Sequence, residues 1–390
     1  MRIIKSALFF SLVFLFPAIS YTAENAPGAR INFGGLEVHP YLVMKERYTD
    51  NVYATGTLQR QDTVTTTVPG LKLQWPVRMH YLEAEYNTAL ERHDTYSEDN
   101  TQDQALRGLA KFNIMGDFTL QLRDDYARGH EPRGSSSTGF IEKFDRNAAG
   151  GSIEYKLADI SKIEVDYTAV KQEFLSSKFR NRIEHLAQGF VYFRFLPKTS
   201  AFLEYDVNNF NFDRDAPDLD NTAERALGGV TWEVSEQLKG TIKGGYQWKK
   251  FNDPTIMTYD TWVASLDITH ALSDYTSIKL IGERKTNESN LQTASFFQTT
   301  GGFAEFSHFF TRSAGVTLNG SYGRDKYTFK NAPRDLARED VYVSGGIGFK
   351  YLPSDMIEAA VHYRHRTRNS TQDAFDYDEN SYSVTLNVGL

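Results

Sequence analysis

The chain has 390 residues, a formal net charge of −7 and no cysteine. The lack of cysteine excludes a disulfide framework, cysteine-based metal sites, thiol catalysis and a lipidated N-terminal cysteine. The acidic balance argues against nucleic acid as a partner. Aromatic residues make up 14% of the chain, which suits a membrane-barrel wall in which only every second residue is apolar.

The N-terminus has the pattern of a secretory signal peptide. Arg2 and Lys5 supply positive charge, residues 7–18 form a short apolar core, and small residues follow it. We therefore predict that residues 1–23 are removed, with cleavage after residue 20 or 23. Residues 24–35 are then a short periplasmic N-terminal segment.

The rest of the chain repeats a unit of two strands. Short polar turns recur every 37–43 residues, and a longer, more polar break lies between successive turns. The turns centre near Pro76, Gly116, Asp159, Pro197, Ser235, Ser273, Thr311 and Pro353. The predicted strands start near Leu36, Asp62, Met79, Gln102, Phe118, Glu142, Ile160, Arg180, Thr199, Thr222, Gln237, Tyr259, Tyr275, Ala294, Ser313, Asp340, Met356 and Glu379.

The predicted strands are two-faced. In residues 238–250, Ile242 and Tyr246 fall on one face and Lys243 falls on the other. The final strand, residues 381–390, alternates in the same way and has about the length of one membrane crossing by a tilted strand. Charged side chains are costly to bury unless they are paired. The polar face must therefore border water or form a network of ion pairs.

An even number of strands, with short turns at one end and long loops at the other, describes a bacterial outer-membrane barrel. We predict an all-β fold, a single antiparallel up-and-down β-barrel of about 18 strands over residues 36–390, with both chain ends at the periplasmic side. A soluble propeller has a similar period but places four strands in each repeat. Aromatic residues near the short turns and near the outer strand ends fit two interfacial girdles.

Four stretches carry a family resemblance: residues 120–126, 150–155, 228–233 and 361–370. Together with the repeated strand, turn and loop pattern, they resemble the outer-membrane β-barrel porins of the porin 2 type, over residues 36–390. The resemblance implies location in the outer membrane. It also implies a role in moving polysaccharide, because genes of this family often accompany exopolysaccharide or capsule synthesis genes. Leu390 departs from the usual terminal Phe or Trp of such barrels.

Charged residues at mid-strand on the polar face are the predicted pore lining, because rings of charge set selectivity in pores. A barrel of this size leaves an aqueous channel unless something plugs it. No segment of the sequence reads as a plug, although a loop folded inward stays open as an alternative. For each of these residues, a structural role in an ion pair that stabilises the barrel wall is an equally good interpretation. The predicted residues are Glu83, Glu85, Arg123, Glu164, Asp166, Glu204, Asp206, Lys243, Lys279, Glu283, His362 and Arg364.

Catalytic and metal sites are not predicted. His93 and His130, each followed by an acid, fit polar residues near outer strand ends, and His362 and His365 point to opposite faces. The acidic run at 213–221 lacks the glycine and terminal glutamate of a calcium loop. We therefore predict no enzyme activity and no cofactor.

The predicted function is an outer-membrane channel for passage or export of saccharide polymer. A general diffusion porin for small solutes is one alternative, and a closed structural or adhesive barrel with partner-binding loops is another. Expected partners are outer-membrane lipids, the barrel-assembly machinery, polysaccharide and periplasmic export components.

Overall fold

A computed structural model describes residues 31–131, 133, 140–213, 219–235, 237–291, 293–329 and 338–389. The predicted signal peptide, the first part of the predicted periplasmic segment, residues 134–139 and the centre of the acidic loop at 214–218 lie outside the described residues.

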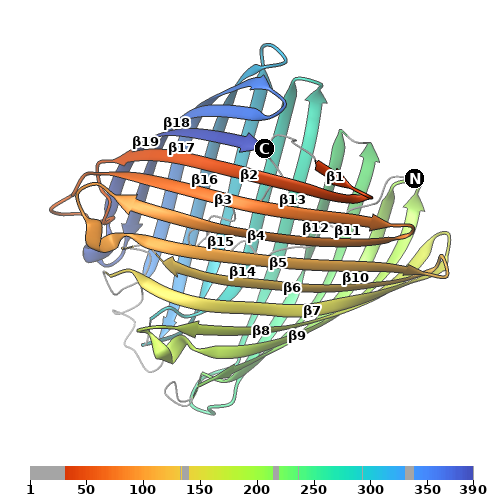
Figure 1. Cartoon of the computed structure of the whole chain (residues 1–390). Helices are drawn as coiled ribbons and strands as arrows, with labels where there is room; N and C mark the ends of the chain where they lie inside the picture. The colour runs from red at the N-terminus through yellow and green to blue at the C-terminus, as the bar shows by residue number, and fades with distance from the viewer. Residues whose placement is uncertain are drawn as a thin grey trace.

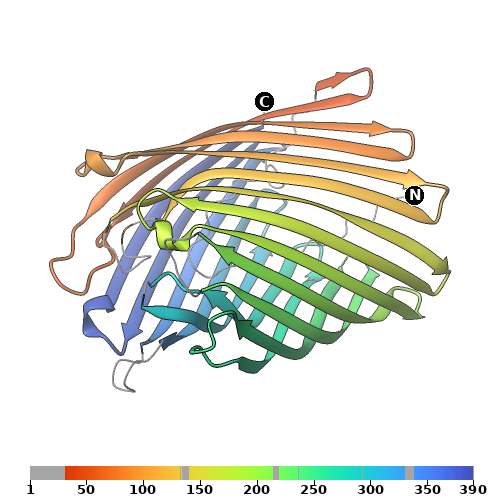
Figure 2. The same cartoon turned by 90° about the horizontal axis from the view of Figure 1, so that it is seen from below.

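The described chain forms one closed antiparallel β-barrel (Figure 1), because the last strand pairs with the first long strand, from Ser381↔Thr49 to Gly389↔Tyr41. Figure 2 shows strands β2–β9 as one tilted wall and the later, teal and blue strands as the wall behind it. The strands are β1 Ile31–Phe33, β2 Leu36–Thr49, β3 Asp62–Val77, β4 His80–His93, β5 Thr101–Ile114, β6 Phe118–Glu131, β7 Glu142–Ala158, β8 Ser161–Phe174, β9 Arg182–Leu196, β10 Thr199–Phe212, β11 Asn221–Ser235, β12 Leu238–Phe251, β13 Tyr259–Ser273, β14 Thr276–Glu288, β15 Ala294–Phe309, β16 Ala314–Phe329, β17 Glu339–Ser354, β18 Ile357–Ser370 and β19 Tyr377–Gly389.

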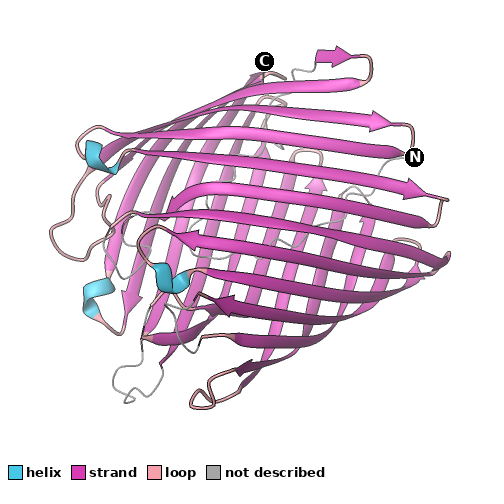
Figure 3. Ribbon diagram, turned by 60° about the horizontal axis from the view of Figure 1, so that its bottom comes forward, coloured by secondary structure: helices cyan, strands magenta, loops and turns pink. Residues whose placement is uncertain are grey.

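The predicted barrel is confirmed, with β2–β19 as its 18 long strands. Each strand begins within two residues of its predicted start. Short turns join the strands at one end, and longer loops join them at the other. Within the described residues, the 3-10 helices η2 Ser97–Asp99, η3 Lys178–Arg180 and η5 Asp373–Phe375 lie in these longer loops (Figure 3). The short strand β1, which precedes the barrel, folds back on the start of β2.

The two faces of the wall differ as the alternation predicts. On β12, Ile242, Tyr246 and Trp248 are exposed, whereas Gln247 and Lys249 are buried. We call the side with the exposed apolar row the outer face and the opposite side the inner face. Exposed aromatic residues lie near both ends of the outer face, as membrane interfaces select: Trp75, Phe193, Phe195, Phe310 and Tyr351 near the short turns, Trp248 and Trp262 near the longer loops. No helix among the described residues is long and apolar enough to cross a bilayer.

The tip of the β14–β15 hairpin, residues 286–291 and 293–299, separates from β13 but stays paired with β16, as far as Ala294↔Phe329. Pairing of β13 with β14 ends at Ala264↔Arg284, while β13 continues along β12 to Tyr259 and β14 continues along β15 to Glu288. Every residue from Ala294 to Thr299 is buried. A strand with one face on lipid cannot bury both faces, so this tip lies inside the barrel. We call it the inturned hairpin.

Candidate channel lining

The twelve predicted pore-lining residues all have the strand parity of the inner face, opposite to that of the exposed apolar row. They come from seven strands: β4 (Glu83, Glu85), β6 (Arg123), β8 (Glu164, Asp166), β10 (Glu204, Asp206), β12 (Lys243), β14 (Lys279, Glu283) and β18 (His362, Arg364). Most of them have polar partners, so the inner face is a network of paired groups rather than a row of single charges.

One pair spans three strands by crossing a glycine. Arg123 of β6 stands opposite Gly150 of β7, and Gly150 stands opposite Thr168 of β8. The guanidinium reaches over the glycine and donates to both carboxylate oxygens of Asp166, each at 2.6 Å, and to Thr168 Oγ1 at 2.5 Å. Bidentate pairs of this kind are strong and directional. The contact therefore fixes the spacing of β6, β7 and β8 on the inner face.

A second pair uses the same arrangement. Lys243 of β12 stands opposite Gly229 of β11. Its ammonium crosses that glycine and lies 2.7 Å from each carboxylate oxygen of Glu204 on β10. Glu204 is almost fully buried, so its charge depends on this partner.

A third crossing joins β2 to β4. Tyr41 of β2 stands opposite Gly70 of β3, and its hydroxyl donates to Glu85 Oε1 at 2.9 Å. Asn87 Nδ2 donates to the same hydroxyl oxygen at 3.1 Å. A Cβ on Gly70 would lie 2.2 Å from the Tyr41 ring. Only glycine leaves room for the ring at this position.

We therefore expect Gly70→Ala to displace Tyr41 and to leave Glu85 without its hydroxyl donor. Forced overpacking costs about 1–3 kcal/mol, and we expect a loss of that size in the free energy of unfolding. Urea titration of the refolded barrel in lipid vesicles measures it. Gly345→Ala is the matched control, because a Cβ there meets nothing within 4 Å. Equal stability of Gly70→Ala and Gly345→Ala would contradict the claim that only glycine at position 70 leaves room for the Tyr41 ring.

Most of the other predicted residues have local partners. Glu83 lies 3.3 Å from Lys72, Asp206 lies 3.1 Å from Arg225, and Glu283 lies 2.9 Å from Lys285. Glu164 lies 3.5 Å from Lys162. The His362 ring lies 3.3 Å from Asn319, Arg364 lies 3.5 Å from Ser344 Oγ, and Lys279 is exposed.

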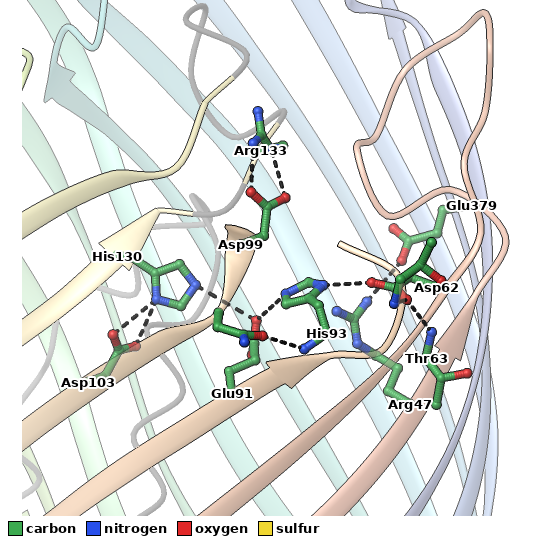
Figure 4. A network of polar contacts seen from close by, with 12 residues as sticks. Arg47, Asp62, Thr63, Glu91, His93, Asp99, Asp103, His130, Arg133 and Glu379 are labelled. Carbon is green, nitrogen blue, oxygen red and sulfur yellow. Dashed lines mark hydrogen bonds and ion pairs between the residues drawn. The ribbon is translucent and has the colours of Figure 1, made fainter. Parts of the chain in front are cut away.

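A network of histidines and carboxylates joins the long-loop ends of β3 to β6 (Figure 4). His93 Nδ1 lies 2.8 Å from Asp62, and its Nε2 lies 3.2 Å from Glu91. His130 lies 3.0 Å from Asp103 and 4.0 Å from the same Glu91. Because both ring nitrogens of His93 face carboxylates, this imidazole is held as a donor and is not poised to accept a proton from a nucleophile. Neither this network nor any other group of His, Asp or Glu side chains among the described residues is placed so that three of them could hold a metal ion.

The inturned hairpin lies against the inner face of β12 and β13. Gln247 Nε2 donates to Thr286 Oγ1 at 2.5 Å, and Lys249 pairs with Glu288. On its other side, Thr299 Oγ1 donates to Asp325 at 2.6 Å. The hairpin therefore occupies space inside the barrel near its long-loop end. The sequence interpretation found no plug, and this short segment is the inward-folded loop that it left open.

Sequence reasoning missed several inner-face cations. Lys45 and Arg47 lie on β2, and Arg366 and Arg368 continue the row of Arg364 on β18. The alternation of the strands would have identified these cations. Met44, Tyr48 and Val361 are exposed on the outer face of the same strands, so residues an odd number of positions away from them point inward.

The family model described as "Putative beta-barrel porin 2" matches residues 26–390. The chain belongs to this family. It is therefore an outer-membrane β-barrel with a porin-like channel architecture, and the predicted location in the bacterial outer membrane follows from this membership.

The chain is similar to several solved structures at low sequence identity. OpdL from Pseudomonas aeruginosa is 12% identical, with a TM-score of 0.50, over 92% of this chain and 100% of that one. OpdQ from Pseudomonas aeruginosa is 11% identical, with a TM-score of 0.48, over 90% of this chain and 99% of that one. A mutant of the ferric enterobactin receptor PfeA from Pseudomonas aeruginosa is 8% identical, with a TM-score of 0.47, over 90% of this chain and 80% of that one. No curated protein matches the chain.

Proposed function

We propose that this porin-family barrel is a channel through which saccharide chains cross the outer membrane. The observation that carries the proposal is an aromatic cluster on the inner face, among paired charges. Phe190 and Tyr192 of β9 are inner residues, because Val191 and Phe193 between and beside them are exposed on the outer face. The Phe190 and Tyr192 rings are stacked with centroids 5.9 Å apart, and Phe202 of β10 lies 5.4 Å from Tyr192.

Aromatic rings beside hydrogen-bonding groups suit a sugar. A pyranose presents an apolar C–H face, which packs on a ring, and a rim of hydroxyls, which needs donors and acceptors. Around Tyr192 the polar groups are already paired: Lys162 lies 4.3 Å from the Tyr192 ring centroid and 2.8 Å from Glu154. Such a surface offers hydrogen bonds without the net charge of a simple ion filter. The resemblance to porins whose genes accompany polysaccharide synthesis points the same way.

Single-channel recording with neutral oligosaccharides tests the proposal. We expect wild-type channels to be blocked transiently by a malto-oligosaccharide, and Tyr192→Ala to weaken the block by at least about tenfold, which corresponds to loss of roughly one stacking contact. Tyr155→Ala is the control, since Tyr155 is exposed on the outer face. Open channels that sugars never block would contradict the proposal.

A general diffusion porin for small solutes is the second candidate. The inturned hairpin favours it, because an object inside the lumen narrows the path for a bulky polymer. Open steps that are insensitive to sugars and to Tyr192→Ala would select this function.

A further inference from the structure

One sector of the inner face carries far more positive than negative charge. On the long-loop halves of β2, β18 and β19, the inner residues include five cations: Lys45, Arg47, Arg364, Arg366 and Arg368. We call them the basic strip. Glu379 is the only carboxylate on the inner face of these three half-strands, all of whose residues are described.

That single carboxylate is already shared. Glu379 pairs with Arg366, lies 3.4 Å from Arg47 and accepts from Thr49 Oγ1 at 3.0 Å. Arg368 is held separately, over the Tyr377 ring at 4.7 Å and against the Phe375 carbonyl. Three of the five cations are therefore fixed by protein groups.

Lys45 and Arg364 differ from the other three. Neither has a carboxylate within ion-pair distance among the described residues, and the guanidinium of Arg364 has only the long contact to Ser344 Oγ, at 3.5 Å. Glu91 of β4 attracts Lys45 from farther away, but it also faces His93 and His130. Arg47 and Arg364 both repel Lys45. Arg366 and Arg47 repel Arg364, and Glu379 attracts it from beyond ion-pair distance. Both carboxylates are already engaged by other groups, so part of the mutual repulsion of the cations remains, and an added anion would relieve it.

The groups between these cations suit the rest of a sugar acid. The inner face of β19 presents Ser381, Ser383 and Thr385, because Tyr382, Val384 and Leu386 are exposed on the outer face. Ser383 stands between Arg47 and His362, and Ser381 stands opposite Arg364. A row of hydroxyls therefore runs between cations on both sides. Successive inner residues along a strand are about 7 Å apart, so a carboxylate can pass from one cation to the next.

We propose that the basic strip binds the carboxylates of acidic saccharides, and that Lys45 and Arg364 are its open positions. This inference rests on the proposed function and narrows it from saccharides in general to those that carry a carboxylate on the sugar ring. A guanidinium binds a carboxylate through two parallel hydrogen bonds, and the neighbouring hydroxyls take the ring oxygens.

The test compares two probes of the same length. Tetragalacturonate carries four carboxylates, and its fully methyl-esterified form carries none. We expect the acid to block wild-type channels at a concentration at least about tenfold lower than the ester. In the double variant Lys45→Gln, Arg364→Gln, the acid should lose this advantage while block by the ester stays unchanged. The double variant Lys171→Gln, Arg128→Gln removes the same charge from exposed positions of the outer face and should behave as wild type.

The outcomes separate this inference from the proposed function. Equal block of wild type by acid and ester, or an acid advantage that survives Lys45→Gln, Arg364→Gln, overturns the basic strip as a carboxylate site and leaves a saccharide channel. If the folded barrel conducts no current, the channel proposal fails. Binding of tetragalacturonate to the detergent-solubilised barrel, measured by calorimetry for wild type and both double variants, then tests carboxylate binding by the basic strip independently of channel activity. Loss of binding only in Lys45→Gln, Arg364→Gln supports it, and no binding to wild type overturns it.

Discussion

Replacement of Lys249 by methionine is expected to release the inturned hairpin. Lys249 pairs with Glu288, and both side chains are almost fully buried, at 1% and 4% exposed. Removal of one partner of a buried pair leaves an uncompensated charge and costs about 3–5 kcal/mol. Glu288 docks the hairpin on β11 and β12, whereas its backbone pairing with β16 does not involve this pair, so the cost falls on the docking. We expect a larger and noisier single-channel conductance in Lys249→Met than in wild type.

The control for this prediction removes both charges of the buried pair, that of Lys249 and that of Glu288. A double variant, Lys249→Met with Glu288→Met, leaves no buried charge, and well-packed apolar replacements of a buried pair are often neutral. We expect it to recover most of the wild-type conductance, because Phe210 and Phe251, whose rings lie 4.8 and 5.4 Å from the ammonium, can pack on methionine. If Lys249→Met conducts as wild type does, the hairpin does not narrow the channel.

Arg123→Met is expected to cause the second large effect, on stability. The Arg123 and Asp166 side chains are 11% and 9% exposed, and Arg123 bridges three strands across Gly150. Its loss leaves the Asp166 carboxylate largely buried without a cation. We expect the free energy of unfolding to fall by about 3–5 kcal/mol, measured by urea titration in vesicles. The free energy of unfolding of Arg123→Lys should lie between those of wild type and Arg123→Met, because an ammonium keeps the charge but cannot form the bidentate contact.

The chain offers a matched control on the same strand. Arg128 and Asp145 form an arginine–aspartate pair with two hydrogen bonds, at 2.7 and 3.1 Å, on the outer face of β6 and β7. These side chains are 57% and 41% exposed. An exposed pair contributes at most about 1 kcal/mol. A similar loss in Arg123→Met and Arg128→Met would mean that burial on the inner face adds nothing to the pair.

The barrel itself could be predicted because its signals are local. A strand alternates with a period of two, and a turn interrupts the alternation, so the sequence around Pro197 or Ser273 marks the strand ends within a residue or two. The inner parity of Arg123, Glu204 and Lys243 follows from the same alternation. These features depend on near neighbours in the chain, which sequence patterns record.

The partners of these side chains could not be predicted in the same way. Arg123 meets Asp166 two strands away because Gly150 lies between them, and that match depends on the register of two successive strand pairs. Lys243 finds Glu204 across Gly229 for the same reason. A glycine opposite an inner cation, with an acid on the strand beyond, is a pattern that can be sought once the register is known.

The inturned hairpin also escaped prediction. Its tip, Ser289 to Thr293, is short and polar and resembles an ordinary surface loop. One local signal was present: Phe296 and Phe297 are adjacent aromatic residues, which breaks the alternation expected of a wall strand. In the structure Phe296 packs on Tyr259 and Phe297 packs on Tyr327, on opposite sides of the hairpin. Burial of both faces is the physical reason for the broken pattern.

The most direct test of the account is the single-channel conductance of the refolded protein without residues 1–23 in a planar bilayer. Heat-modifiable migration on a gel confirms beforehand that the barrel is folded. The proposed channel requires an aqueous path past the inturned hairpin and therefore predicts steady open steps at low voltage. A folded barrel that gives no steps, both as wild type and as Lys249→Met, would contradict a channel through this protein.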